Sequence, residues 1–399
     1  MGAARVTGRP RLLAIRAGAL FDGVSETLMA EPVLVADGAR IVAVGPAIVP
    51  PAGAEIVDLP GATLLPGLID THVHLAFDAS ADPVTALAGR TDDDVVRAMA
   101  DAGRAAVRGG VTTVRDLGDR GYLSLGLRGA AGLPAIVAAG PPITTPRGHC
   151  HFLGGGTAPA PGALRAAVRE RADHGVDVIK VMASGGTMTP GTRQETAQFT
   201  AGQLRGIVEE AHRLGRPVTA HAHGTAAIRA ALDAGVDGME HVSFWSADGV
   251  DDPGDLVERI AGSRVTVGLT AGVVPVPGAE PPAAVLMRMP RIVANTRRMR
   301  EAGAHLALGT DAGIGPPKPH DVLRSAVAQT AAIGLSLPAA LRLATSTAAA
   351  VCGLAAGKGR LAPGFDADIL AVDGDPLTDP AALHRIRAVF LRGDRVTLA

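Results

Sequence analysis

The sequence predicts an α/β protein in which a (β/α)8 barrel of the TIM type carries a small β-sandwich built from both ends of the chain. Strand-like apolar runs alternate with amphipathic stretches between about residues 66 and 357, which is the pattern of βα units around a parallel sheet. Short strand-like runs separated by turns occupy both ends of the chain. Hydrophobic residues make up 47% of the 399 residues and aromatic residues only 2%, so the core must consist of the small and branched side chains that fill such barrels.

The two ends of the chain are expected to form one small domain. Strand-like runs lie at 12–15, 32–35 and 40–44, and Asp37-Gly38 between the last two predicts a tight hairpin. Strand material returns at 367–372 and 388–396, where Gly393-Asp394 predicts another turn. Because chain ends commonly lie close together, we expect these strands to pair. The predicted domains are residues 1–65 and 358–399 for the sandwich and 66–357 for the barrel.

The middle of the chain holds one strand candidate for each unit of a (β/α)8 barrel. The eight candidates are 64–74, 111–116, 135–143, 176–183, 217–223, 236–243, 264–270 and 304–311. Helices are predicted at 92–107, 162–173, 200–214, 225–234 and 283–301. Glycines at 175, 215, 235 and 303 precede strands and are expected to end helices in the left-handed conformation. The Pro- and Gly-rich stretch 272–282 is expected to be a loop over the strand ends.

Charge and cysteine content exclude several classes of function. The net charge is −1, so nothing favours binding to nucleic acid or to an anionic membrane, and a small-molecule partner is expected. Cys150 and Cys352 are the only cysteines and lie far apart in sequence, which predicts neither a disulfide framework nor a thiolate metal site. The first twenty residues lack an uninterrupted apolar segment, and no run is long enough to span a membrane. We therefore expect a cytoplasmic protein. A homo-oligomer is also expected, although none of these observations bears on it.

Metal-ligating side chains recur at the ends of the predicted strands. His72 and His74 are spaced i, i+2, so both imidazoles point to the same face at one strand end, where neutral ring nitrogens can hold a divalent cation. Four further groups end other apolar runs: Lys180, His221, His241 and Asp311. A barrel of this type places its catalytic groups at that rim. A lysine in an apolar strand is costly to bury unless it is paired or modified. The pattern predicts a hydrolytic metal centre.

Five segments together resemble the amidohydrolase superfamily: Pro-Gly-Leu-Ile-Asp-Thr-His-Val-His, the lysine strand followed by Ala-Ser-Gly-Gly, Ala-His-Ala-His-Gly, Glu-His and Gly-Thr-Asp-Ala-Gly. The resemblance spans about residues 11–395. Within the superfamily the chain is most similar to the group around Xaa-Pro dipeptidases, carboxypeptidase-like enzymes, imidazolonepropionases and ochratoxin-type amide hydrolases. Lys180 argues against the imidazolonepropionase branch, which uses one metal and has no bridging lysine.

The resemblance implies a two-metal site and the role of each ligand. His72, His74 and Asp311 would hold the more buried ion, and His221 and His241 the more exposed one. Lys180, carboxylated by CO2, would bridge both, because a carbamate offers two anionic oxygens where an ammonium offers none. The expected cofactors are thus two divalent ions, Zn2+ above all, and CO2 as the carbamate.

The predicted reaction is hydrolysis of an amide or peptide-like C–N bond, as in a dipeptidase, carboxypeptidase or N-acyl amino acid hydrolase. A metal-activated hydroxide would attack the carbonyl, with Asp311 as general acid and base. The same centre could instead hydrolyse a lactone, a carbamate or a phosphotriester. Hypotheses of other classes are a non-catalytic barrel that binds a metal or ligand, and a structural protein without metal.

Each predicted substrate-binding histidine has two possible roles. His223 shares the face of His221 and could replace it as ligand, but we favour His221 as ligand and His223 as a substrate contact. His149, in the loop after the third strand, is the candidate for polarising or anchoring the substrate carbonyl. His151 has an equal claim to be structural, and the sequence leaves open which of the two contacts substrate.

Two arginines could bind a substrate carboxylate. Arg147 and Arg193 could pair with it as bidentate forks or remain solvated loop charges. Asp116 and Glu240 are expected to support ligating imidazoles, and Cys150 is expected to be a buried thiol.

Overall fold

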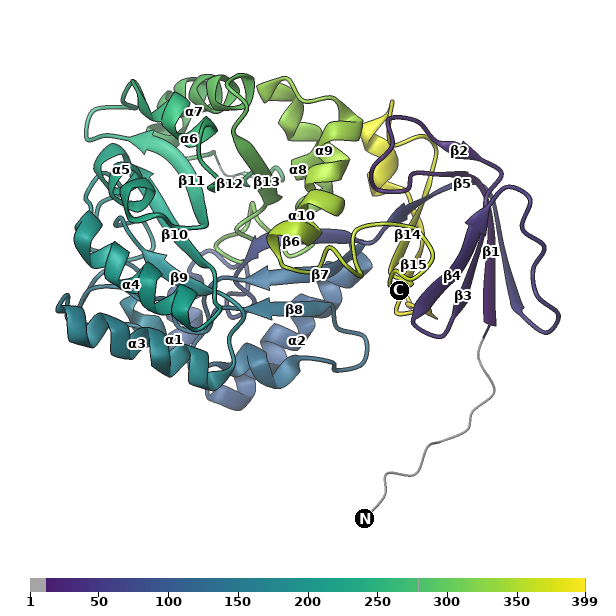
Figure 1. Cartoon of the computed structure of the whole chain (residues 1–399), viewed down its shortest axis with the longest axis horizontal. Helices are drawn as coiled ribbons and strands as arrows, with labels where there is room; N and C mark the ends of the chain where they lie inside the picture. Colours follow the sequence, from purple (N-terminus) through teal and green to yellow (C-terminus); the bar gives the residue numbers. More distant parts are fainter. Residues whose placement is uncertain (1–11, 279, 399) are drawn as a thin grey trace, which may run out of the picture.

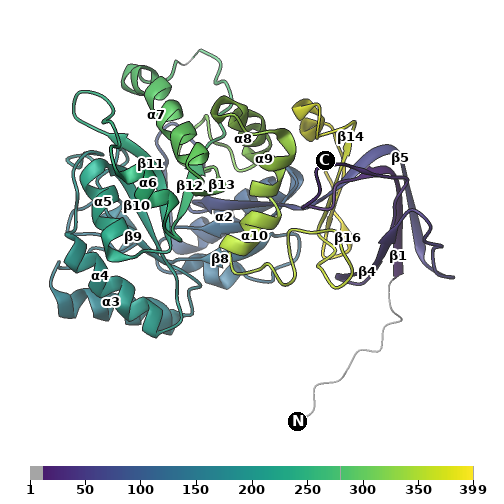
Figure 2. The same ribbon diagram turned by 45° about the horizontal axis from the view of Figure 1, so that its top comes forward.

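The computed structural model describes residues 12–278 and 280–398. Figure 1 shows a larger body of parallel strands surrounded by helices and, beside it, a smaller body of strands from both ends of the chain. The turned view in Figure 2 shows the same division. Of the first twenty residues, in which no uninterrupted apolar segment is expected, residues 1–11 lie outside the described part.

The smaller body is one mixed sheet. Its strands are β1 (Leu12–Leu20), β2 (Met29–Ala30), β3 (Val33–Asp37), β4 (Arg40–Gly45), β5 (Glu55–Pro66), β14 (Ile369–Asp373), β15 (Ile386–Leu391) and β16 (Asp394–Arg395). The order is β16-β15-β14-β5-β1-β3-β4, with β2 on β1. The expected hairpin is present, since Asp37 pairs with Arg40 across β3 and β4, and strands from both ends pair where β14 meets β5.

The expected sandwich differs from this sheet in one respect. The strands form a single sheet rather than two separate ones. The pairing of β1 with β5 shifts register between Ala17 and Ala19, and such an irregularity bends a sheet. Side chains of β1, β3, β5, β14 and β15 enclose an apolar core of their own that includes Ile15, Leu34 and Phe390.

The larger body holds eight parallel strands at the eight predicted positions. One sheet contains β6 (Leu68–Val73), β7 (Val111–Asp116) and β8 (Ala135–Ala138). The other contains β9 (Ile179–Met182), β10 (Val218–Gly224), β11 (Gly238–Trp245), β12 (Thr266–Thr270) and β13 (His305–Gly309). Single parallel bridges connect the two sheets at both edges, Val73 to Ala312 and Ile143 to Val181. These strands are almost wholly buried, which fits their continuous apolar sequences.

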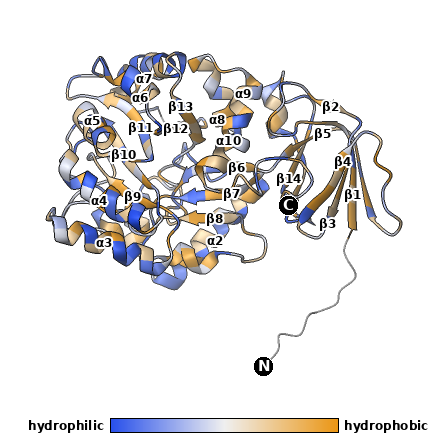
Figure 3. Cartoon of the chain, viewed as in Figure 1, coloured by the Kyte–Doolittle hydropathy of each residue, from blue (hydrophilic) through white to orange (hydrophobic). Residues whose placement is uncertain are grey.

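The five predicted helices are present. They are α2 (Asp92–Arg108), α3 (Pro161–His174), α4 (Ala201–Arg213), α5 (Thr225–Ala234) and α7 (Ala283–Glu301). Thr91 and Asp94 form a capping box at the start of α2, and Gly175 and Gly235 end α3 and α5 in the left-handed conformation, as expected. Figure 3 shows hydrophobic strands at the centre and hydrophilic residues on the outer helices.

Shorter helices complete the body. They are α1 (Pro83–Ala88), α6 (Leu256–Ala261), α8 (Leu323–Gln329), α9 (Leu337–Leu343), α10 (Ser346–Val351) and the 3-10 turns η1 (Leu123–Leu127), η2 (His151–Leu153), η3 (Thr330–Ile333) and η4 (Pro380–His384). Those after β13 were not singled out from the sequence. No helix within the described residues is both long enough and apolar enough to cross a bilayer.

The small sheet connects directly to the strand that carries the histidine pair. Only Gly67 separates β5 from β6. Its N–H donates to the carbonyl of Asp368, next to β14, at 2.8 Å. A Cβ at Gly67 would lie 2.2 Å from Oγ1 of Thr112, so only glycine fits this crossing.

Candidate metal centre

The six predicted ligand residues line one cavity of about 670 Å3 at the carboxyl ends of the parallel strands. His72 and Lys180 lie within β6 and β9, His221 and His241 within β10 and β11, and Asp311 two residues after β13. His72 and Lys180 are each 1% exposed. Parallel strands end at the same edge, which is why residues up to 239 positions apart in the chain meet here.

His72, His74 and Asp311 form the first group, in which one ligand atom of each lies within 4.8 Å of the others. Nε2 of His72 lies 3.4 Å and Nε2 of His74 3.3 Å from Oδ1 of Asp311. Nδ1 of His72 lies 3.1 Å from Oε2 of Glu240, and Nδ1 of His74 lies 3.1 Å from the carbonyl of Gly118. An imidazole that donates through Nδ1 leaves Nε2 as a lone pair, so both rings can offer Nε2 to a cation.

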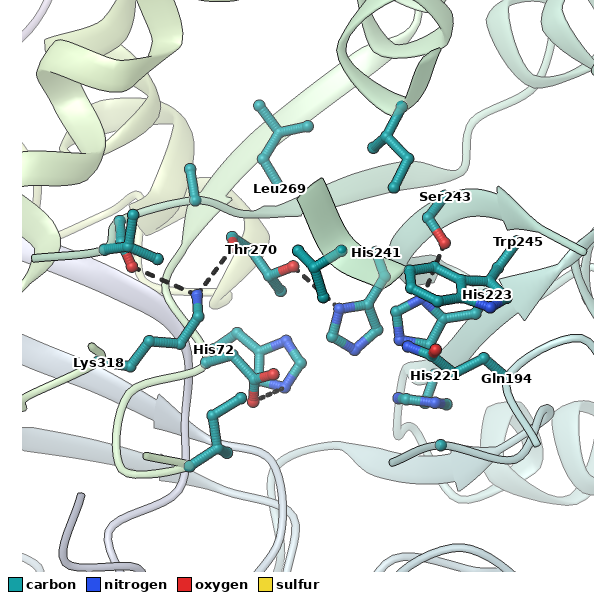
Figure 4. A pocket seen from close by; sticks show the side chains of 18 of the residues that line it. His72, Gln194, His221, His223, His241, Ser243, Trp245, Leu269, Thr270 and Lys318 are labelled. Carbon is teal, nitrogen blue, oxygen red and sulfur yellow. Dashed lines mark hydrogen bonds and ion pairs between the residues drawn. The ribbon is translucent and has the colours of Figure 1, made fainter. Parts of the chain in front are cut away.

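His221, His223 and His241 form the second group, again within 4.8 Å. Nε2 of His221 lies 3.1 Å from the carbonyl of Gly185, which leaves Nδ1 of that ring free. The Nδ1 atoms of His241 and His223 lie 2.9 Å and 2.8 Å from the hydroxyls of Thr270 and Ser243. The structure thus brings His221 and His223 together to the same group, and the choice between them as ligand stays a prediction. Figure 4 shows the three rings beside one another, with Thr270 next to His241 and Ser243 next to His223.

Lys180 lines the same cavity, and its Nζ is buried without a hydrogen-bond partner. Burial lowers the pKa of Lys180 to about 8. An amine with that pKa is partly neutral at physiological pH, and only the neutral form can react with CO2. Since a buried polar atom is normally paired, an orphaned Nζ beside two groups of metal ligands fits a carbamate that bridges two cations.

Electrostatics at the site favour neutral imidazoles and an ionised Asp311. Burial lowers the pKa of His72 to about 4 and that of His221 well below its ordinary value. Burial alone would raise the pKa of Asp311, but the adjacent His72 and His74 outweigh it and hold that pKa well below its usual range. Neutral imidazole and carboxylate are the forms that bind metal.

Glu240 is placed behind the first group, as expected for a supporting residue. It is 1% exposed, and Arg115 and Thr219 donate to its Oε1 at 2.9 Å and 2.7 Å while Oε2 lies beside His72. Burial would raise its pKa, but Arg115 and His72 lower it below its ordinary value. The other predicted support, Asp116, is buried at the end of β7, where it accepts from the N–H of Gly118 at 3.4 Å.

The loop after β8 places its polar residues in two locations. His149 lines the cavity, is 4% exposed, and its ring centroid lies 4.7 Å from that of His221. Cys150 is a buried thiol, as expected, whose pKa burial raises to about 12. Nδ1 of His151 lies 3.0 Å from the carbonyl of Gly148, and His151 does not line the cavity.

Arg147 and Arg193 line a second pocket of about 450 Å3 that shares no residue with the first. The side chain of Arg193 is 72% exposed and forms an ion pair with Glu195 at 3.2 Å. The predicted carboxylate-binding arginines are therefore brought together with each other and not with the candidate ligands.

Sequence reasoning missed several residues around the site. Thr270 and Ser243 each fix one imidazole, and Lys318 donates to carbonyls at the ends of β12 and β13. Thr270 is the last residue of a predicted strand, and this position alone could have indicated that it lies at the site. Nothing in the sequence around Lys318 indicates its role.

The chain is similar to known proteins along most of its length. Residues 63–396 match the model of the amidohydrolase family. The ochratoxinase of Aspergillus niger is 29% identical over 360 residues, which cover 82% of this chain and 73% of that protein. Two solved structures are also similar: a Xaa-Pro dipeptidase with bound methionine (26% identity, TM-score 0.82, 96% of this chain and 99% of the other) and a putative prolidase from Bifidobacterium longum (28% identity, TM-score 0.80, 97% and 94%).

Proposed function

The chain belongs to the amidohydrolase family and is a hydrolytic enzyme that acts on C–N bonds, and from this premise we propose that it uses two metal ions to cleave a linear amide or peptide-like bond. The observation that carries the proposal is the cavity itself. Two three-residue ligand groups and a buried, unpartnered lysine amine line one space at the strand ends.

We assign the ligands as the resemblance implies. His72, His74 and Asp311 would hold one ion, His221 and His241 would hold the other, and Lys180 as its carbamate would be a ligand of both. The free Nε2 atoms of His72 and His74 and the free Nδ1 of His221 support this assignment. Such a set of nitrogen and oxygen ligands suits Zn2+. When bound, two divalent cations lower the pKa of a water molecule toward ~7 and polarise the scissile carbonyl.

Residues of the chain would carry the proton and orient the substrate. Asp311, ionised and directed at both imidazoles of the first group, would accept the proton of the attacking water and deliver it to the leaving amine. His149 lines the cavity with its Nδ1 unpartnered and would hold the substrate carbonyl or its developing oxyanion. His223, held by Ser243, would contact the substrate beside it.

The proposed fold joins the two parallel sheets of the larger body into one. We propose that the eight parallel strands close into one (β/α)8 barrel, since single parallel bridges join the two sheets at both edges. The domain limits at residues 65/66 and 357/358, the cytoplasmic location and the homo-oligomer remain predictions from the sequence.

Elemental analysis and a substrate panel test the proposal. Protein loaded with Zn2+ and bicarbonate should hold two equivalents of metal per chain and hydrolyse at least one linear amide. A lactone, carbamate or phosphotriester as the preferred substrate would move the function to the alternative reactions. Two bound metals without turnover of any of these would favour a non-catalytic barrel, and protein that binds no metal would contradict the site.

The two histidines of β10 can be separated by the same analysis. His221→Ala should lose one equivalent of metal, whereas His223→Ala should keep both and bind substrate less well. Equal metal loss in the two variants would contradict the assignment of His221.

A further inference from the structure

One side of the cavity is an apolar wall, defined here as Val285, Met289, Ile292 and Val293 of α7 and Ile333 of η3. None of these five residues belongs to a motif identified in the sequence. Met289 and the neighbouring Val273 also line the cavity and are 44% and 48% exposed, so the apolar surface reaches the solvent. A cavity of about 670 Å3 is large enough for a drug-sized group.

The cavity offers no free cationic side chain outside the proposed ligands. None of the described residues that line it is an arginine. Lys318 lines it, but its ammonium donates to three carbonyls, those of Thr270, Gly272 and Thr310, at 3.0, 3.3 and 2.6 Å. An ammonium has three donors, so Lys318 has none left for a ligand. Arg147 and Arg193 line the second pocket instead.

One further arginine, Arg288, lies close by and uses four of its five N–H donors within the protein. The guanidinium of Arg288 stacks 4.5 Å from the ring centre of Trp245, which lines the cavity. Its nitrogens donate to the carbonyls of Ala284, Ser246, Ala247 and Gly249. Arg288 therefore holds Trp245 and the start of α7 in place, and it is not among the residues that line the cavity.

From these contacts we propose that the natural substrate class is neutral: an uncharged linear amide whose apolar group packs against the apolar wall, rather than a dipeptide or an N-acyl amino acid. Among the described residues that line the cavity, a carboxylate next to the wall would find no free cationic side chain, and a charged group that loses water without such a partner is costly to bury. The proposal rests on the proposed amide hydrolysis and narrows its substrate.

The test uses two substrates that differ only in the carboxylate, N-benzoyl-leucine and N-benzoyl-3-methylbutylamine, with the zinc-loaded protein. We expect kcat/KM for the neutral amide to be at least about 10-fold higher. A second measurement is calorimetric binding of both compounds to zinc-loaded Asp311→Asn, where the neutral amide should again bind at least about 10-fold more tightly.

A matched pair of variants sharpens the test. Met289→Arg puts a guanidinium at the edge of the wall and should shift the ratio of kcat/KM values toward the carboxylate about 10-fold. Met287→Arg makes the same change on the same helix at a residue that is 74% exposed and does not line the cavity, and it should leave the ratio unchanged.

The outcomes separate this inference from the proposed function. Equal or better hydrolysis of N-benzoyl-leucine, with its KM raised by Arg147→Ala or Arg193→Ala, would overturn the neutral class and leave amide hydrolysis standing. If neither compound nor any other amide is hydrolysed, the proposed function fails, and the binding ratio alone decides the neutral class.

Discussion

The two sides of the cavity are built in opposite ways. The ligand set comes from strands and their ends, and each of its four imidazoles is hydrogen-bonded through one ring nitrogen. It consists of His72, His74, Lys180, His221, His241 and Asp311. The apolar wall comes from one helix and a 3-10 turn and offers only van der Waals surface. In the proposed function, the reaction therefore depends on side chains that hydrogen bonds hold in place, whereas the choice of substrate depends on apolar side chains that make no such bonds.

The largest effect is expected from replacing Asp311, the residue of the ligand set that is proposed to transfer the proton. Asp311→Asn should lower kcat by at least about 10²–10⁴-fold, because the amide cannot accept a proton. Metal content measured on the same sample should stay close to that of the wild type. An active Asp311→Asn protein would contradict the role given to this residue.

The second largest effect is expected behind the ligands. Glu240→Gln removes the charge that holds His72 and pairs with Arg115, and it should weaken metal binding about 10- to 100-fold. Glu209→Gln, which removes an exposed ion pair with Arg165, is the matched control. Competition with a chelator measures both, and equal affinities would show that Glu240 does not position the ligand.

The pH dependence of metal loading tests Lys180. The pKa of about 8 lies below the ordinary 10.5, so the neutral amine that reacts with CO2 gains about 10-fold from pH 6 to pH 7 and stops increasing above about pH 8 to 9. Activity recovered by metal-free protein at fixed dissolved CO2 should follow that curve. A rise that continues to pH 10 would indicate an ordinary amine, and loading without CO2 would exclude the carbamate.

The smallest effect belongs to the wall. Val293→Ala removes two methyl groups that line the cavity and should raise KM for an apolar substrate by up to about 10-fold with kcat unchanged. Leu286→Ala, on the same helix but 51% exposed and outside the cavity, should leave KM as it is. A fall in kcat for Val293→Ala would mean that the wall also positions the reacting bond.

The ligand set could be predicted from the sequence, whereas the apolar wall could not. His72 and His74 carry their geometry in their spacing, and each further ligand follows an apolar run, so strand periodicity alone places them at one rim. The wall gives no such signal. Helix α7 was predicted with its observed bounds, 283–301, but strand and helix periodicity do not indicate which of its faces meets the cavity. Nor do they indicate the directions of Arg147 and Arg193, which depend on loops.

The single residue between β5 and β6 has a consequence for biosynthesis. β14 pairs with β5 in register, and the carbonyl of Asp368 accepts from Gly67, five residues before His72. During translation the histidine pair leaves the ribosome early, yet the strand that anchors it is made some 300 residues later. We expect the nascent chain to stay inactive until residues 369–391 have left the ribosome. A stop codon shortly before this segment would therefore yield an inactive protein.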